Sequence, residues 1–464
     1  MNTITPNQLD QERPFSLRFS RRGDDILLAV GAREVSLRAT YRELRQRYPR
    51  RFRGAITYSE EAFRHNLRET STVLTRHFAE HRVHWAVKSA PIQGLVNIAA
   101  QEGAAFDVGS SEELLMARRA GADGGRIYHT APAKFDWDIE AIVEHNCVPI
   151  SDNLTELRLV DRKAGERGRR IVAGIRINPA VGSSTQREIS TGSLDCKFGL
   201  PDISGDVLAA LKGLGNLDIR VLHMHIGSQI SDPADYSRAL ESMLRVYSLF
   251  LQRGFHIDTL DIGGGYPYRY LDHPEAADGA GAEARGYSNY AASDFETYMS
   301  EVEAVLRDTL GDQVPRIAIE PGRHVAAGTA FALGYVLNTK LYPNGIRWVM
   351  SSISVNDLFH KELVPAAYFD VHVVKESSGR TVPSALGGTL CFSGDILTPW
   401  GAAVEMEENI ERGDILLFDG VGAYSLLGSG NFHNMPRLPL LMIDAGLDLV
   451  ELRPQEEPYF EARE

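Results

Sequence analysis

Residues 83–130 read VHWAVKSAPIQGLVNIAAQEGAAFDVGSSEELLMARRAGADGGRIYHT. Three short apolar runs, VHWAVK, AAFDV and RIYHT, alternate in this stretch with segments of helical pattern. Strands that alternate with helices predict βαβ units and a parallel sheet. The sequence around residue 100 therefore predicts the α/β fold class.

Five further runs of the same kind bring the number to eight: CVPIS (147–151), RIVAGIRINP (170–179), IRVLHMHIG (219–227), IDTLDIGGG (257–265) and RIAIEPGR (316–323). Eight strand–helix units predict a closed (β/α)8 TIM barrel, which we expect over residues 60–325. Outside it, segments such as GTAFALGYVLN (328–338) predict a mainly antiparallel β domain formed by residues 1–59 and 326–464. We expect the Ala-, Gly- and acid-rich stretch 272–293 to be a mobile insertion between the last two barrel strands.

The bulk composition excludes several classes of function. With 49 Lys and Arg against 62 Asp and Glu, the formal net charge is −13, which argues against a nucleic-acid or anionic membrane partner. The three cysteines are too scattered for a disulfide framework or a zinc site, and we predict no metal. The N-terminus resembles no signal peptide, and no apolar run is long enough to span a membrane. We expect a cytoplasmic enzyme.

Polar residues stand at the carboxyl ends of the predicted strands, where a TIM barrel carries its active site. They are Lys88, Asp107, Arg176, Asn178, His225 and Glu320. In the run 219–225, alternate residues share one face, which places His225 at the mouth of the barrel. We expect all six side chains to converge on one rim.

These residue types suit an anionic ring cofactor. A lysine beside apolar walls is partly desolvated, which helps its amine to form a Schiff base. A phosphate bound without a metal needs backbone N–H groups, a hydroxyl and an arginine, and Gly263 to Gly265, Ser228 and Arg323 offer them. Glu320 stands three residues before Arg323, and a carboxylate that faces a pyridine nitrogen keeps the ring protonated as an electron sink.

At these residues the sequence resembles the alanine racemase-like class of pyridoxal 5'-phosphate (PLP) enzymes, and within it the ornithine/diaminopimelate decarboxylases. The similar segments are AVKS, FDVGSSEEL, RINP, ISTGSLDCKFG, HMHIGSQI, DIGGGYP, IEPGR, CFSGD and GVGAYS. The segments ISTG…KFG, HIGSQ and CxSGD are particularly similar to the diaminopimelate decarboxylase branch. The resemblance runs through nearly the whole chain in one order.

The resemblance implies a role for each motif. Lys88 would link PLP, His225 would stack on its ring, Glu320 would contact the ring nitrogen, and Asp107 and Arg176 would support the lysine and the ring oxygen. Together with Cys391, the residues Lys88, His225 and Glu320 would be the catalytic groups. The phosphate would be held by Ser228, Gly264, Gly265, Arg323 and Tyr424. Cys391 and Asp395 would come from the other subunit of a homodimer with shared active sites.

Two positions depart from the family pattern in the region where the resemblance implies substrate contacts, at His360, Phe392, Asp395 and Tyr424. Phe392 stands where diaminopimelate enzymes carry Glu, an acid that would contact the far amino group of a diamino substrate. His360 replaces an arginine that would hold a substrate carboxylate, and His does not reproduce a bidentate Arg clamp. The resemblance therefore implies PLP chemistry more firmly than it implies diaminopimelate.

We interpret the chain as a PLP-dependent amino-acid decarboxylase that acts on a small-molecule amino acid other than diaminopimelate. The alternatives are a genuine diaminopimelate decarboxylase and a D- or L-ornithine/lysine decarboxylase. An amino-acid racemase of this fold would place Arg rather than Glu320 at the ring nitrogen. A non-catalytic PLP carrier would lack the C-terminal β domain with its Cys391 and Tyr424 motifs.

Overall fold

The structure of the chain is a computed structural model, and it describes residues 3–4, 15–185, 190–193, 195–200, 203–270, 293–358, 369–398, 403–426 and 429–457. The chain forms two compact units. The barrel unit comprises 67–267 and 292–322, and the β unit comprises 1–66, 268–291 and 323–464. Most of the predicted insertion, 272–292, lies outside the described residues.

The barrel unit contains a closed barrel of eight parallel strands, as the sequence predicts. In chain order the strands are β6 (His81–Ala86), β7 (Ala105–Val108), β8 (Ile127–His129), β9 (Val148–Ser151), β10 (Ile171–Arg176), β11 (Leu217–His223), β12 (Thr259–Asp261) and β13 (Arg316–Ile319). Strand β13 pairs with β6 and closes the barrel. The α/β fold class and the TIM barrel are confirmed.

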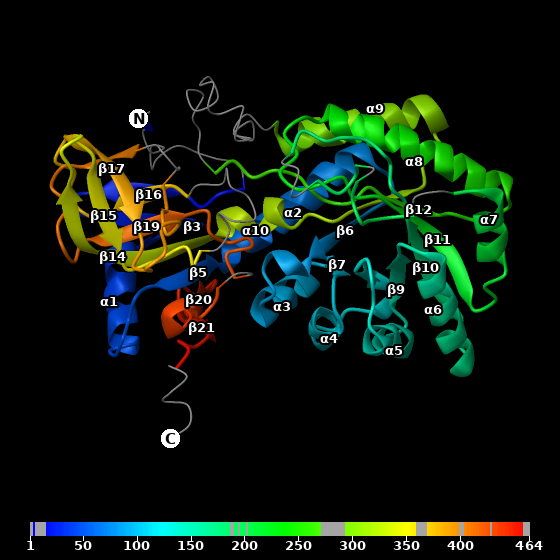
Figure 1. Cartoon of the computed structure of the whole chain (residues 1–464), viewed down its shortest axis with the longest axis horizontal. Coiled ribbons are helices and arrows are strands. Elements are labelled where there is room, and N and C mark those ends of the chain that lie inside the picture. The colour runs from blue at the N-terminus through cyan, green and yellow to red at the C-terminus, as the bar shows by residue number, and fades with distance from the viewer. Residues whose placement is uncertain are drawn as a thin grey trace. The chain divides into compact units, whose positions relative to one another are not determined.

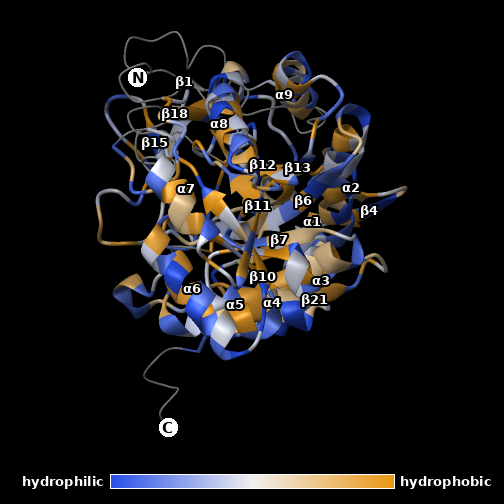
Figure 2. Ribbon diagram, turned by 90° about the vertical axis from the view of Figure 1, so that its right-hand side faces the viewer, coloured by the Kyte–Doolittle hydropathy of each residue, from blue (hydrophilic) through white to orange (hydrophobic). Residues whose placement is uncertain are grey.

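One helix, α2, precedes the first barrel strand, and the other helices of this unit connect the barrel strands (Figure 1). They are α2 (Glu60–His77), α3 (Gln93–Gln101), α4 (Ser111–Arg119), α5 (Asp136–His145), α6 (Leu154–Glu166), α7 (Gly205–Lys212), α8 (Ala234–Gln252) and α9 (Phe295–Leu310). Figure 2 shows the division of polarity: strands β10 and β11 are largely hydrophobic, whereas helices such as α6 alternate between hydrophobic and hydrophilic residues. That alternation is the pattern of a helix with one buried face.

Local sequence signals set where the helices begin. The side chains of Ser110, Asn153 and Asp294 each accept a hydrogen bond from a backbone N–H three residues further on, at α4, α6 and α9. Such caps satisfy N–H groups that the first helical turn leaves without a partner. Acidic residues follow the caps, and they interact favourably with the positive end of the helix dipole.

The described residues of the β unit form two sheets, one of ten strands and one of three. Its elements are β1 (Thr3–Ile4), β2 (Phe19–Arg22), β3 (Asp25–Val30), β4 (Arg33–Ser36), α1 (Leu37–Arg47), β5 (Ala55–Ser59), α10 (Arg323–Ala326), β14 (Ala330–Leu341), β15 (Arg347–Ser351), β16 (Val371–Val373), β17 (Thr381–Gly387), β18 (Ala403–Glu407), β19 (Ile415–Asp419), β20 (Leu440–Ile443) and β21 (Leu449–Arg453). Most pairs are antiparallel, as predicted, while β15–β17, β20–β5 and β1–β18 are parallel.

Two barrel strands end earlier than the sequence pattern indicates. Strand β6 ends at Ala86, and Lys88 lies in the short 3-10 helix Val87–Ser89 that follows. Strand β11 ends at His223, so His225 lies two residues beyond the strand. The prediction that the strand pleat orients His225 is therefore wrong, because a turn follows and a hydrogen bond there holds the ring.

Within the described parts of the chain, no helix is long and apolar enough to cross a membrane.

Packing inside the barrel gives the first prediction. A Cβ at Gly174 in β10 would lie 2.4 Å from Ile150 Cδ1 and 2.9 Å from Val221 Cβ. We expect Gly174→Ala to lower the free energy of unfolding by about 1–3 kcal/mol, the usual cost of overpacking a core. Urea unfolding checks this, with Gly125→Ala as the control because nothing lies within 4 Å of its Cβ position. Equal midpoints for both variants would contradict the packing argument.

Candidate active site

Lys88 meets a buried carboxylate at the carboxyl ends of β6 and β7. Its Nζ donates to Asp107, which is completely buried. The hydroxyl of Thr130 donates to the other oxygen of Asp107. Burial and then the charge of Glu320 raise the pKa of Asp107, while Lys88 acts in the opposite direction. The amine of Lys88 is thus held at one position while its side chain stays 42% exposed.

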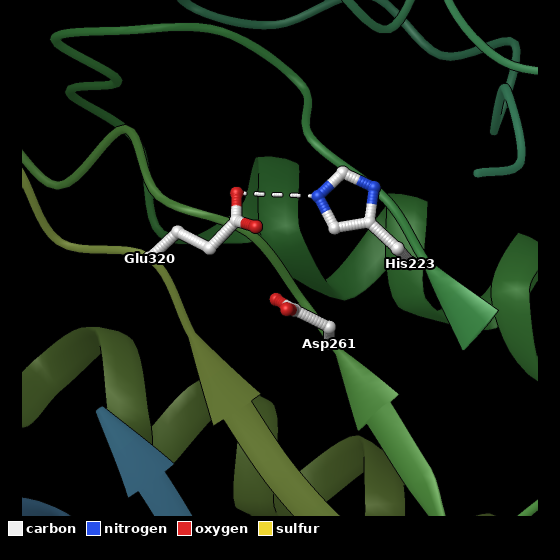
Figure 3. A group of neighbouring side chains, drawn as sticks. All are labelled: His223, Asp261 and Glu320. Carbon is white, nitrogen blue, oxygen red and sulfur yellow. Dashed lines mark hydrogen bonds and ion pairs between the residues drawn. The ribbon is translucent and has the colours of Figure 1, made fainter. Parts of the chain in front are cut away.

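Glu320 follows β13 directly and is buried. Its Oε2 lies 3.2 Å from Nε2 of His223, the last residue of β11 (Figure 3). Burial by itself would raise the pKa of Glu320, but the hydrogen-bonded His223 and the charge of Lys88 lower it below its usual range. Glu320 is therefore an ionised carboxylate. Its Oε1 is buried and has no hydrogen-bond partner among the described residues.

Asp261, the last residue of β12, lies beside this pair (Figure 3). Oxygen and nitrogen atoms of His223, Asp261 and Glu320 come within 4.8 Å of one another. Burial, followed by the charge of Glu320, raises the pKa of Asp261 well above its usual range. The pKa values of these two neighbouring carboxyls are thus shifted in opposite directions, because one has a close basic partner and the other does not.

The triple glycine after β12 forms a tight turn against His225. The N–H of Gly264 donates to Nδ1 of His225 at 3.0 Å, and the phenol of Tyr236 donates to the carbonyl of Gly264 at 2.7 Å. A Cβ at Gly264 would lie 2.1 Å from the carbonyl oxygen of Glu320. Only glycine fits this close approach, and the turn fixes the plane of the His225 ring.

The electrostatics around His225 favour the neutral ring. Burial, and next the charge of Arg176, lower the pKa of His225 well below its usual value. Arg176 ends β10, is buried, and lies 4.2 Å from the centre of the Phe198 ring. A neutral imidazole whose Nδ1 accepts a hydrogen bond presents a flat face, which suits stacking on another ring.

The barrel-unit residues to which the resemblance assigns a role lie at or just beyond the carboxyl ends of barrel strands. They are Lys88, Asp107, Arg176, His225, Ser228, Gly264, Gly265 and Glu320. The carbonyl of Ser228 accepts from the hydroxyl of Thr185, and the carbonyl of Gly265 accepts from the N–H of Ile230 at 3.0 Å. The strand order therefore supports the prediction that these residues share one end of the barrel.

In the β unit, Arg323 and Tyr424 lie together. The buried Arg323 begins α10, and its guanidinium carbon lies 4.6 Å from the centre of the Tyr424 ring. Arg323 also donates to the phenol of Tyr270 at 2.6 Å. Tyr424 has a φ of 63°, an uncommon conformation for a residue with a side chain. Such backbone strain clusters at functional sites.

The CFSGD segment shows which of its side chains are accessible. Cys391 is exposed, and the Phe392 side chain is 47% exposed with its ring 6.4 Å from that of Phe432. Asp395 instead is buried and accepts from the N–H groups of Val355 at 2.8 Å and Leu390 at 2.7 Å. The carboxylate of Asp395 thus holds its own loop. His360 lies outside the described residues.

The residues of these groups that were not predicted include His223, Asp261 and Tyr270. His223 and Asp261 both end strands, so the rule that selected the other rim residues applies to them as well. Tyr270 follows DIGGGYP, and no spacing in the sequence indicates its contact with Arg323. That contact depends on tertiary structure between residues 53 positions apart.

Comparisons with known proteins define the class. The model of the pyridoxal-dependent decarboxylase family, pyridoxal binding domain, matches residues 64–327. The chain is 27% identical over 388 residues to the diaminopimelate decarboxylase of Aquifex aeolicus, covering 82% of this chain and 85% of that protein. It is 29% identical over 410 residues to the diaminopimelate decarboxylase of Actinosynnema pretiosum, covering 87% and 85%.

Among solved structures, diaminopimelate decarboxylase from M. jannaschii superposes with a TM-score of 0.80 at 22% identity, covering 95% of both chains. Lysine/ornithine decarboxylase from Vibrio vulnificus, complexed with putrescine, gives a TM-score of 0.69 at 21% identity, covering 87% of this chain and 97% of that one. These likenesses support the fold.

The chain belongs to the pyridoxal-dependent decarboxylase family. It is a PLP-dependent decarboxylase, a carbon–carbon lyase, which confirms the predicted class and cofactor. The donor set of the barrel unit fits this cofactor: Glu320 offers an anionic oxygen without a partner among the described residues, and Lys88 offers an amine beside a buried acid.

The position of Lys88 generates a test. We expect Lys88→Ala to lose the visible absorption band that PLP gives when it is bound to a lysine. Borohydride treatment of the unaltered protein should fix the cofactor on the peptide that contains Lys88. Lys134→Ala is the control, because Lys134 is a buried lysine of the same unit that is paired with Glu156. A label on another lysine, or an unchanged visible spectrum in Lys88→Ala, would refute the assignment.

Proposed function

We propose that this decarboxylase acts on an amino acid whose side chain is bulkier or less charged than that of diaminopimelate, with the reaction carried by the rim residues of the barrel. The observation that carries the proposal is Phe392, an exposed aromatic ring next to Cys391, together with the engagement of the nearby acids by protein partners. The barrel residues supply the reaction, and the CFSGD segment selects the substrate.

In this proposal the residues around PLP each hold one part of it. Lys88 would bind it covalently, Asp107 would position the lysine amine, and the neutral ring of His225 would stack on the cofactor. Arg176 supports the ring oxygen. The phosphate is held by Ser228, Gly264, Gly265, Arg323 and Tyr424. Bound PLP supplies an electron-accepting ring for the charge left when CO2 departs.

Glu320 and Cys391 have two different roles in this proposal: Glu320 accepts a hydrogen bond, and Cys391 donates a proton. The ionised Glu320 would accept a hydrogen bond at Oε1 from a protonated ring nitrogen, which would keep the ring electron-poor. The partner's Cys391 donates a proton from Sγ to the substrate carbon that has lost CO2. A carboxylate suits the first task because a neutral amide cannot stabilise a pyridinium charge.

Whether the substrate side chain can bear a positive charge depends on which acidic residues are available to pair with it. A substrate ammonium placed against Phe392 without a counter-charge would cost several kcal/mol, and a cation–π contact with the ring would return about 0.5–2 kcal/mol. An acid from another position would have to supply the remainder.

Three acids of the β unit are candidates, Asp357, Glu362 and Asp395; Glu362 lies outside the described residues, and the other two are engaged elsewhere. Asp357 forms a bidentate ion pair with Arg53, with both N–O distances at 2.8 Å, and also accepts from the N–H of Ser354. Asp395 accepts two backbone N–H groups. Using either acid for a substrate would break these bonds. This supports a substrate without a free terminal ammonium.

Diaminopimelate decarboxylation is the second candidate function. The observation that favours it is similarity to proteins of that name. The diaminopimelate decarboxylases of Aquifex aeolicus and Actinosynnema pretiosum align with more than four fifths of this chain. Against it stand the substitutions at Phe392 and His360, which remove both groups expected to hold the far end of diaminopimelate.

We also propose a homodimer with shared sites. The support is the exposure of Cys391 and Phe392, two motif residues on the surface of the β unit. In a homodimer, the exposed thiol of Cys391 would complete the active site of the other subunit.

The substrate proposal is tested by comparing kcat/KM over a panel of D- and L-amino acids with charged, polar and apolar side chains. We expect an uncharged or modified side chain to give the highest value. If meso-diaminopimelate is best, the substrate proposal is wrong. If ornithine or lysine is best, only the argument about the terminal ammonium is wrong.

Phe392→Glu provides a matched variant for this panel. It should raise kcat/KM for diamino substrates about tenfold or more, since a charge-assisted contact contributes about 1.5–3 kcal/mol. Leu341→Glu adds the same charge at another exposed apolar position of the β unit and should leave the specificity unchanged. An identical response of the two variants would contradict a substrate contact at Phe392.

The shared site is tested by subunit mixing. Lys88→Ala and Cys391→Ala should each be inactive or nearly so, because one lacks the cofactor lysine and the other the proton donor. Hybrid dimers of the two should recover activity, since one of their two sites then contains both residues. Subunit exchange is verified with a tagged subunit and native mass spectrometry. No recovery despite proven exchange would refute a site shared between subunits.

A further inference from the structure

We propose that His223 is a positioning residue for Glu320: it occupies Oε2 of the carboxylate and thereby directs Oε1 to the ring nitrogen of the cofactor. The inference rests on the proposed contact between Glu320 and that nitrogen. His223 has no role in the motif assignments above, and it adds a residue to the machinery of the reaction.

The hydrogen bond between the two side chains has only one possible direction. Both side chains are buried, and Nε2 of His223 lies 3.2 Å from Oε2 of Glu320 (Figure 3). An ionised carboxylate can only accept hydrogen bonds, so the hydrogen is on Nε2. His223 thus takes one oxygen of Glu320 and leaves the other for a second donor.

The second oxygen of Glu320, Oε1, indicates what kind of donor is required. Oε1 of Glu320 is buried without a hydrogen-bond partner among the described residues. A buried charged oxygen without a donor is unfavourable, so the working enzyme is expected to supply one. A protonated ring nitrogen is a donor of the correct charge.

The strand register makes the arrangement rigid. His223 pairs with Asp261 across β11 and β12, and Asp261 pairs with Ala318 across β12 and β13. The N–H of Glu320 then donates to the carbonyl of Gly263 at 2.9 Å. Because His223 and Asp261 end two neighbouring strands and Glu320 directly follows the third, the barrel strands fix the position of Glu320.

Asp261 completes the arrangement without competing for the ring nitrogen. Its Oδ1 accepts from the N–H of Gly263 at 2.9 Å, which leads the chain into the glycine turn. Burial and the charge of Glu320 raise the pKa of Asp261, which disfavours a second anion beside the ionised Glu320.

A purely structural role and a positioning role make different predictions. If His223 only fills the core, replacing it changes the stability of the protein and leaves the cofactor ring unaffected. If it positions Glu320, the protonation of the ring nitrogen changes even in a fully folded variant. The measurement must therefore report on the ring nitrogen itself.

The experiment uses the full-length protein loaded with PLP labelled with 15N in the ring, and records the 15N chemical shift of that nitrogen. Glu320→Gln supplies the reference shift for a neutral partner. His223→Leu removes the donor, His223→Gln keeps an N–H group of similar reach, and His223→Asn is one methylene shorter. His129→Leu is the control, since His129 is a buried histidine of the same barrel, on β8, near Asp138.

We expect His223→Leu and His223→Asn to move the shift toward that of Glu320→Gln, whereas His223→Gln and His129→Leu stay near the unaltered protein. An unchanged shift in folded His223→Leu overturns the inference. If that variant does not fold, as judged by circular dichroism, an unchanged shift in His223→Asn overturns it instead. Failure of the unaltered protein to bind PLP would overturn the proposed function as well, which distinguishes the two results.

Discussion

The buried carboxylates at the carboxyl end of the barrel are the constraint on which the site depends. Asp107 and Asp261 lie at the carboxyl ends of β7 and β12, Glu320 follows β13, and all three are buried, so any charge on them must be balanced inside the protein. Lys88 donates a hydrogen bond to Asp107 and His223 donates one to Glu320, while burial and the charge of Glu320 raise the pKa of Asp261. Because β13 pairs with β6, closure of the barrel brings the Glu320 strand beside the Lys88 strand. The fold thus determines the charge state of the site.

The sequence predicts the barrel and its rim well because both depend on local pattern. Apolar runs of strand length mark all eight strands, and polar residues at their ends mark Lys88, Asp107, Arg176 and Glu320. The pattern fails at His225, since strand alternation holds only while the strand continues. Beyond His223 a hydrogen bond from Gly264 orients the ring, and no periodicity encodes that bond.

The side-chain network was harder to predict because it depends on the register between strands. His223 and Asp261 are neighbours only through pairing of β11 with β12, although 38 positions separate them in the chain. Asp395 gives the opposite case. Its position in CFSGD suggests a substrate contact, yet its carboxylate accepts the N–H groups of Val355 and Leu390. Whether an acid is available for a substrate is decided by its partners, which a motif does not specify.

We therefore assign the type of reaction and the choice of substrate to different parts of this chain. The family model spans residues 64–327, which contain Lys88, Glu320 and the glycine turn, the groups to which we assign the decarboxylation itself. Phe392, which we propose discriminates among substrate side chains, lies in the β unit outside that span. A binding site built for a charged group rejects substrates that lack it, because its own polar groups would be left unpaired. Replacing such a group by an aromatic ring removes that penalty for uncharged substrates and imposes a desolvation cost on charged ones. Relatives at 27–29% identity thus support the reaction of this chain more strongly than its substrate.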